Sequence, residues 1–170
     1  MKRALEELLS GRDERAAWQR ARLSRGGTFI CQIALNIPGC PKRLPGDLAV
    51  IKKCRDALLA HTGARPVDER YLENGAGACW QGAFDASSFD AAHFKRVAVE
   101  AENSFESGRI LDIDVITAQG ALSRTAMGLP ERRCLLCGES AKLCARLGSH
   151  KKSELREIAV RLIKSAAAGR

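Results

Sequence analysis

G-R-I-L-D-I-D-V-I, residues 108–116, is an aliphatic run that contains two aspartates two positions apart. Residues i and i+2 of a β-strand point to the same face, so the run predicts a strand with Asp112 and Asp114 side by side and an aliphatic opposite face. Neighbouring carboxylates repel and are costly to bury, and a hard divalent cation, most often Mg²⁺, relieves both effects. The pair by itself is equally consistent with a half-exposed strand whose polar face is acidic.

The sequence around this strand predicts the other elements. They are a helix over 3–24, a strand over 28–36, a proline-rich loop over 36–46, a helix over 48–61 capped by Asp47, strands over 66–73 and 78–84, a helix capped by Ser87 or Ser88 that ends near 104, and a short partner strand from Leu122. We therefore predict an α+β fold with a single antiparallel or mixed sheet and helices on one face. A ferredoxin-like split βαβ order is the first expectation, and a nucleotidyltransferase-like mixed sheet is the alternative.

The chain divides near residue 130. Residues 1–130 form the predicted α+β catalytic domain, and residues 131–170 form a small Cys/His-rich segment and a C-terminal helix, capped by Ser153, that pack on the same domain. No apolar run approaches the length of a membrane span, and the N-terminus has no apolar signal region, so we expect a cytoplasmic protein.

Charge is distributed unevenly along the 170 residues. Residues 1–60 carry 12 Lys and Arg against 6 Asp and Glu, residues 61–120 carry 5 against 10, and residues 121–170 carry 11 against 4. Two basic ends flanking an acidic middle suit an anionic ligand that bridges a metal and basic side chains. Nucleic acid is the competing ligand, but aromatic residues make up only 5% and do not alternate with basic ones.

Cys134, Cys137, Cys144 and His150 have the spacing C-x₂-C-x₆-C-x₅-H. Thiolates and an imidazole are typical zinc ligands, and four protein ligands leave no open position, so this set predicts a structural Zn²⁺ site. A redox-active Cys pair and free thiols in a core are the alternatives.

Three further groups of residues suit phosphate. Gly108 allows close approach to the backbone, and Arg109 reaches outward from the entrance of the aspartate strand. The loop from Asn36 to Gly39, with Lys42 and Arg43 behind it, can cradle an anion. A basic run follows the aspartate strand at Arg124, Arg132 and Arg133. The alternative for Arg109 is a surface ion pair with a neighbouring glutamate, and the alternative for the loop and for the basic run is solvated surface charge.

An ordered set of short motifs now stands out. It comprises LNIPG (35–39), GRILDIDV (108–115), LSR (122–124), GLP (128–130), RRCLLC (132–137) and CAR (144–146). Together they resemble the CitX family, the apo-citrate lyase phosphoribosyl-dephospho-CoA transferases, also called holo-citrate lyase acyl-carrier-protein synthases. The resemblance runs from about residue 10 to residue 165.

The resemblance implies a reaction and its participants. Family members transfer the phosphoribosyl-dephospho-CoA group from triphosphoribosyl-dephospho-CoA to a serine of the citrate lyase acyl carrier protein, with release of pyrophosphate. Asp112 and Asp114 then hold Mg²⁺ against the triphosphate, and one of them, or a hydroxide on the metal, helps to deprotonate the serine. Arg109 is the third expected catalytic residue, and the expected substrate-binding residues are Asn36, Gly39, Lys42, Gly108 and Arg124. Many nucleotidyltransferases have a Gly-Ser or Gly-Gly pair about ten residues before the aspartates, whereas Gly108 is only four before Asp112.

Two alternative functions remain open at this point. One is a zinc-containing nucleic-acid-binding module, which leaves the aspartate pair unexplained. The other is a non-catalytic assembly factor for a carrier protein. The expected partners exclude a membrane, and nucleic acid is disfavoured.

Overall fold

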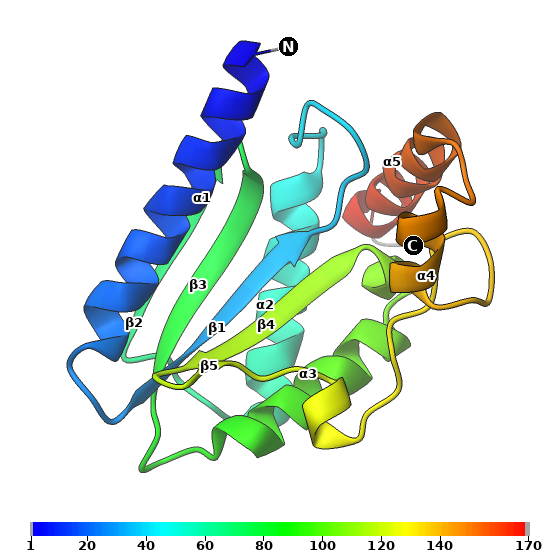
Figure 1. Cartoon of the computed structure of the whole chain (residues 1–170). Coiled ribbons are helices and arrows are strands. Elements are labelled where there is room, and N and C mark those ends of the chain that lie inside the picture. The colour runs from blue at the N-terminus through cyan, green and yellow to red at the C-terminus, as the bar shows by residue number, and fades with distance from the viewer. Residues whose placement is uncertain (1, 169–170) are drawn as a thin grey trace.

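The structure, a computed structural model, describes residues 2–168 (Figure 1). Its elements in chain order are α1 (Lys2–Leu23), β1 (Thr28–Leu35), α2 (Asp47–Thr62), β2 (Asp68–Asn74), β3 (Gly77–Asp85), α3 (Ala91–Ser104), the 3₁₀ turn η1 (Glu106–Arg109), β4 (Leu111–Thr117), β5 (Gly120–Ala121), the 3₁₀ turn η2 (Thr125–Met127), α4 (Ala141–Leu147) and α5 (Lys152–Ala168).

The five strands form one antiparallel sheet in the order β2-β3-β1-β4-β5. β3 lies between the parallel strands β1 and β2, which α2 connects, and β1 lies between the parallel strands β3 and β4, which α3 connects. Two interleaved crossovers of this kind make the split βαβ arrangement, so the predicted α+β, ferredoxin-like fold is confirmed. Because every pairing is antiparallel, the mixed-sheet alternative is not observed.

One face of the sheet is apolar and packs against α2 and α3 (Figure 1). Alternate residues of β1 and β4 enter this core, as strand geometry requires. Phe29, Phe84 and Phe94 form its aromatic centre, with ring centroids 4.8–5.4 Å apart. α5 extends the core by burying Ala159 and Ile163.

α1 lies across the opposite face of the sheet, which the prediction of helices on one face did not include (Figure 1). This helix packs through polar contacts: Arg15 donates to the carbonyl oxygen of Gly77 at 2.8 Å, and Gln19 donates to Gln32 at 3.0 Å. Two leucines of this helix are largely in solvent, since Leu5 is 57% and Leu9 is 48% exposed. Gly11 lets α1 approach closely, because a Cβ there would lie 2.5 Å from Asn74 Oδ1.

Three predicted helix caps were wrong by one to three residues. Asp90, rather than Ser87 or Ser88, caps α3 by accepting from the backbone N–H groups of its first turn, while both serines donate to Asp85. Gly46 precedes α2, and Asp47 is already helical.

At the C-terminal end, α5 begins at Lys152, one residue before the predicted Ser153 cap. The partner strand β5 ends at Ala121, just before the predicted Leu122. Helix α4 was not predicted, because its seven residues are too few to show a clear hydrophobic period. Among the described residues, no helix is both long and apolar enough to cross a membrane.

Candidate functional site

The aspartate pair lies on the face of the sheet that α1 covers. Alternation along β4 buries Leu111, Ile113 and Val115 in the core and turns Asp112 and Asp114 the other way, which confirms that the two carboxylates share a face. In the register of the sheet, Asp112 is opposite Ala34 and Asp114 is opposite Gln32. The small Ala34 side chain leaves space above Asp112.

The two carboxylates have different surroundings. Asp112 accepts a hydrogen bond from Arg132 at 2.9 Å, and its side chain is 42% exposed. Asp114 has neither a hydrogen bond nor an ion pair to another residue in the described part of the chain. Burial and the neighbouring Asp112 raise the pKa of Asp114, although Lys95 and Arg132 oppose the shift. A carboxylate that bonds to no other described residue and lies beside a second carboxylate is the arrangement that a divalent cation stabilises.

A cavity of about 370 Å³ lies in front of the pair. Its floor is formed by β1 and β4, one wall by α1, and its rim by the loop after β1. The polar and charged residues that line it are Arg12, Arg15, Gln19, Gln32, Asn36, Lys42, Asp112 and Asp114. Cations therefore line the α1 and loop sides, and carboxylates line the β4 side.

The loop over residues 36–46 brings Lys42 to this cavity. Lys42 Nζ donates to the carbonyl oxygen of Ile37 at 2.5 Å, and Arg156 of α5 donates to the carbonyl oxygens of Pro38 and Pro41. Burial lowers the pKa of Lys42; Cys40 opposes this shift, whereas nearby basic side chains, Arg12 first, add to it. Arg43 turns away, because it pairs with Asp47 and Glu73.

A second hollow of about 610 Å³ holds three of the other predicted residues, Gly108, Arg109 and Arg124. Its centre is the buried carboxylate of Glu102, which accepts from the backbone N–H of Ile113 at 2.7 Å, from Arg132 at 3.0 Å and from Arg124. Arg132 thus joins this hollow to the cavity, since the same guanidinium reaches Asp112.

Gly108 and Arg109 have packing contacts in this hollow. A Cβ on Gly108 would overlap the carbonyl oxygen of Glu102, so the glycine is needed where η1 touches α3. Arg109 Nη2 donates to the carbonyl oxygens of Cys134 at 2.5 Å and Cys137 at 3.4 Å. Of the predicted residues, the structure therefore brings Asn36, Lys42, Asp112 and Asp114 together in the cavity, and it places Gly39, Gly108, Arg109 and Arg124 outside the cavity lining.

Sequence reasoning missed the contribution of α1. Arg12, Arg15 and Gln19 are spaced by three and four residues, which places them on one helical face. That spacing was the available signal, together with Gln32, a polar residue between the buried Cys31 and Ile33. Nothing local could show that this helical face lies over Asp112 and Asp114, about 100 positions later in the chain.

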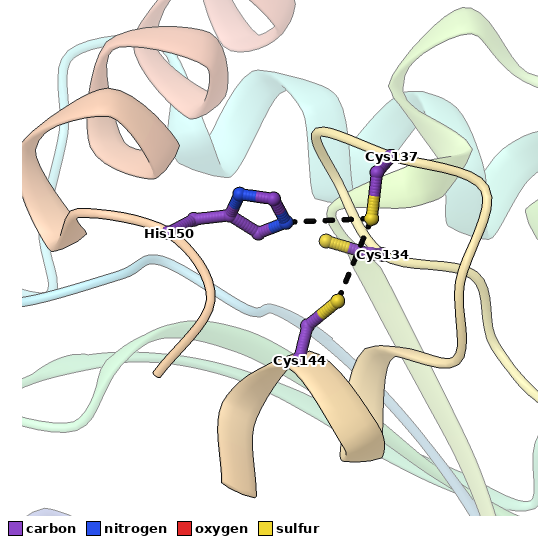
Figure 2. A group of neighbouring side chains, drawn as sticks. All are labelled: Cys134, Cys137, Cys144 and His150. Carbon is purple, nitrogen blue, oxygen red and sulfur yellow. Dashed lines mark hydrogen bonds between the residues drawn. The ribbon is translucent and has the colours of Figure 1, made fainter. Parts of the chain in front are cut away.

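Cys134, Cys137, Cys144 and His150 converge beside α4 (Figure 2). Their ligand atoms all lie within 4.8 Å of one another. The Sγ atoms of Cys137 and Cys144 are 3.5 Å apart, and His150 Nε2 is 3.3 Å from Cys137 Sγ. Thiolates at 2.3 Å from a tetrahedral Zn²⁺ would be about 3.8 Å apart, so the spacing of these atoms is close to that of a four-ligand zinc site.

Local backbone contacts shape this cluster. Arg133 bridges to Ser140, and the backbone N–H of Cys134 donates to the carbonyl oxygen of Glu139 at 2.7 Å, which folds the C-x₂-C segment into a tight turn. α4 supplies Cys144, and His150 lies just before α5. Although burial alone would raise it, the backbone N–H groups of Cys137 and Leu136 lower the pKa of Cys134 to about 7. A thiol that ionises readily is suited to metal binding.

Comparison with known proteins identifies the family. The family described as apo-citrate lyase phosphoribosyl-dephospho-CoA transferase (CitX) matches residues 3–166. The protein of that name from Citrobacter koseri is 37% identical over 153 residues, which cover 89% of this chain and 84% of that protein. The protein of the same name from Escherichia coli O6:K15:H31 is 34% identical over 160 residues, with the same coverage.

A third relative is much longer than this chain. Protein CitXG from Haemophilus influenzae is 35% identical over 158 residues, which cover 89% of this chain and 33% of that protein. The chain thus corresponds to about one third of CitXG and to most of the other two relatives. It belongs to the apo-citrate lyase phosphoribosyl-dephospho-CoA transferase family and is an enzyme.

Proposed function

We propose that this chain transfers the phosphoribosyl-dephospho-CoA group from triphosphoribosyl-dephospho-CoA to a serine of the apo-citrate lyase acyl carrier protein. The observation that carries the proposal is Asp114, which has no hydrogen bond or ion pair among the described residues and lies beside Asp112, facing a cavity whose other sides are basic. A polyphosphate and a divalent cation are the ligands that such a division of charge favours. A nucleic-acid-binding module would leave this aspartate pair without a use.

The proposed reaction is a displacement at phosphorus. The serine oxygen bonds to the phosphorus next to the ribose, the bond from that phosphorus to the oxygen of the next phosphate breaks, and pyrophosphate leaves. One of the two carboxylates accepts the serine proton, for which a raised pKa makes Asp114 the better base. Arg132 orients Asp112 through their 2.9 Å hydrogen bond.

Asp112 and Asp114 fit Mg²⁺ because they are neighbouring hard oxygen donors, one of them without a protein partner. When bound there, the ion would neutralise phosphate charge and stabilise the leaving pyrophosphate. Lys42 and Asn36 bind phosphate oxygens at the rim of the cavity. A cavity of about 370 Å³ is small for the whole precursor. We therefore retain Gly39, Gly108, Arg109 and Arg124 as predicted contacts for the parts of the substrate that extend beyond it.

The test of this function is Asp114→Asn, assayed by mass spectrometry of apo-carrier protein after incubation with precursor and Mg²⁺. The variant should fold and lose transfer by about 100-fold or more, because it removes a proton acceptor and a metal ligand. Asp56→Asn is the matched control, since Asp56 lies on α2 in a surface ion pair. Retention of most of the activity in Asp114→Asn would overturn the assignment.

We further propose that the Cys/His cluster holds a structural Zn²⁺. Four soft or borderline donors within 4.8 Å of one another match the usual ligand set of such sites. Purified protein should contain one zinc, and Co²⁺ in its place should show thiolate-to-metal absorption. Cys144→Ser should weaken that spectrum, whereas Cys40→Ser, at an exposed thiol outside the cluster, should not. Metal-free protein with full stability would contradict this site.

A further inference from the structure

Three cations face the cavity without a carboxylate partner. Arg15 is 91% buried, and although its Nη2 donates to the carbonyl oxygen of Gly77, its Nε is a buried polar side-chain atom with no partner among residues 2–168. Arg12, one turn earlier, forms no hydrogen bond or ion pair within the same residues. In the described part of the chain, Lys42 donates only to the carbonyl oxygen of Ile37.

Such a group of cations is unfavourable without an anion. Like charges near one another repel, and a buried guanidinium with an unsatisfied N–H bears a desolvation cost. Among other partly buried arginines, Arg124 and Arg132 share Glu102 and Arg55 binds Glu69. Arg70 and Arg156 have no carboxylate partner either, but they bond to amide or carbonyl oxygens and, among the described residues, have no buried N–H left without a partner, unlike Arg15. The absence of acidic partners at Arg12 and Arg15, in the part of the chain described, therefore points to a ligand that supplies the negative charge.

We propose that Arg12 and Arg15 of α1, together with Lys42, form a subsite for the two terminal phosphates of the triphosphate precursor, which leave as pyrophosphate. This inference rests on the proposed function and extends it to the α1 wall. Asp112 and Asp114 lie on the β4 side of the same cavity. In a displacement at phosphorus the attacking and leaving oxygens are in line on opposite sides, so a base on β4 and a pyrophosphate subsite on α1 and the loop are mutually consistent.

The subsite has consequences for inhibition. Inorganic pyrophosphate, as product, competes with the precursor for these cations. A fork of N–H donors from two arginines suits paired phosphates better than a single phosphate. Free pyrophosphate should therefore bind more tightly than inorganic phosphate.

The test is calorimetric titration of the full chain with inorganic pyrophosphate at fixed Mg²⁺, without acyl carrier protein. Arg12→Gln should raise the dissociation constant roughly tenfold to hundredfold, the effect of losing a charged hydrogen bond, and should raise the inhibition constant of pyrophosphate by the same factor. Arg15→Gln should act in the same direction. Arg20→Gln is the matched control, because Arg20 is on the same helix, is exposed and does not line the cavity.

The outcomes separate this inference from the proposed function. If Arg12→Gln binds pyrophosphate as tightly as Arg20→Gln, the subsite is wrong, even in a protein that transfers its group normally. Should Arg15→Gln fail to fold, Arg12→Gln still decides, since its side chain makes no contact that the fold requires. If the wild type binds pyrophosphate through these arginines but modifies no carrier protein, the subsite stands and the proposed function falls.

Discussion

The α1 cavity and the Cys/His cluster both gather groups that a cation would stabilise, but they differ in closure. The cluster brings four donors within 4.8 Å of one another, enough to complete the coordination of a tetrahedral ion. The cavity offers two carboxylates, one of them without a hydrogen bond or ion pair to any residue that the structure describes, and about 370 Å³ of open space. A closed set suits structure, and an open set suits chemistry on a bound ligand.

The two regions are joined by arginines. Arg132 lies two residues before Cys134 and contacts both Asp112 and Glu102, and Arg109 at the end of η1 binds the carbonyl oxygens of Cys134 and Cys137. The fold of the Cys/His segment therefore determines where the Arg132 guanidinium lies beside the aspartate pair. A substitution in the Cys/His segment should therefore also affect the aspartate pair.

The largest effect is expected for Cys144→Ser. Loss of a zinc ligand should destabilise the segment around it, which has little core of its own, by roughly 4 kcal/mol. Transfer activity should fall as well, because Arg132 is no longer held beside Asp112. Thermal unfolding and carrier modification measure the two effects, with Cys40→Ser as control. A variant that loses stability but keeps full activity would show that the two regions are independent.

Glu102→Gln should follow, at about 3 kcal/mol. The change leaves Arg124 and Arg132 partly buried without their carboxylate, and breaking a buried pair from one side is strongly destabilising. Urea unfolding measures the loss, and Glu100→Gln, at an exposed position of α3, is the control. Equal stability of the two variants would show that the ion pairs of Glu102 do not stabilise the contact between the two regions.

The sequence predicted the parts of the molecule in which the decisive residues are close together in the chain. The alternation in residues 111–115 was sufficient to place Asp112 and Asp114 on one face, because one face of β4 is wholly aliphatic. The Cys/His ligands lie within 17 consecutive residues, so their spacing carried the signal.

The cavity depended on contacts that local patterns do not record. α1 packs through Arg15 and Gln19 rather than through an apolar stripe, so hydrophobic periodicity gave no indication of the face it covers. The position of Arg132 similarly depends on the folded segment that follows it, which brings a residue 20 positions from Asp112 to within 2.9 Å. Long-range placement of polar groups was therefore the part that sequence could not supply.

Arg109→Gln sharpens the comparison at a smaller scale. Its contacts to two carbonyl oxygens of the Cys segment predict weaker zinc retention and a loss of about 1–3 kcal/mol in stability. Zinc release to a competing chelator and the KM for the precursor distinguish its two possible roles. A raised KM with unchanged zinc retention would support the predicted contact with phosphate. An unchanged KM with weaker zinc retention would show that Arg109 stabilises the Cys/His segment instead. Arg96→Gln, at an exposed position of α3 that does not line this hollow, is the control.

The smallest effect concerns stability at Asp114. Its pKa is raised in the folded protein, so the folded state binds more protons than the unfolded state between the ordinary aspartate value near 3.9 and the raised value, and stability falls as pH rises through that window. Asp114→Asn should therefore be slightly more stable than wild type at pH 7 in metal-free buffer, by about 1 kcal/mol or less, or at most about 2–4 °C. The advantage should vanish below about pH 4, where the wild-type carboxyl is also neutral.

Mg²⁺ should stabilise the wild type and not the variant, because ligand binding to the folded state alone raises its stability. A less stable variant at pH 7 would make Asp114 a structural residue and would leave the cavity without its unsatisfied carboxylate.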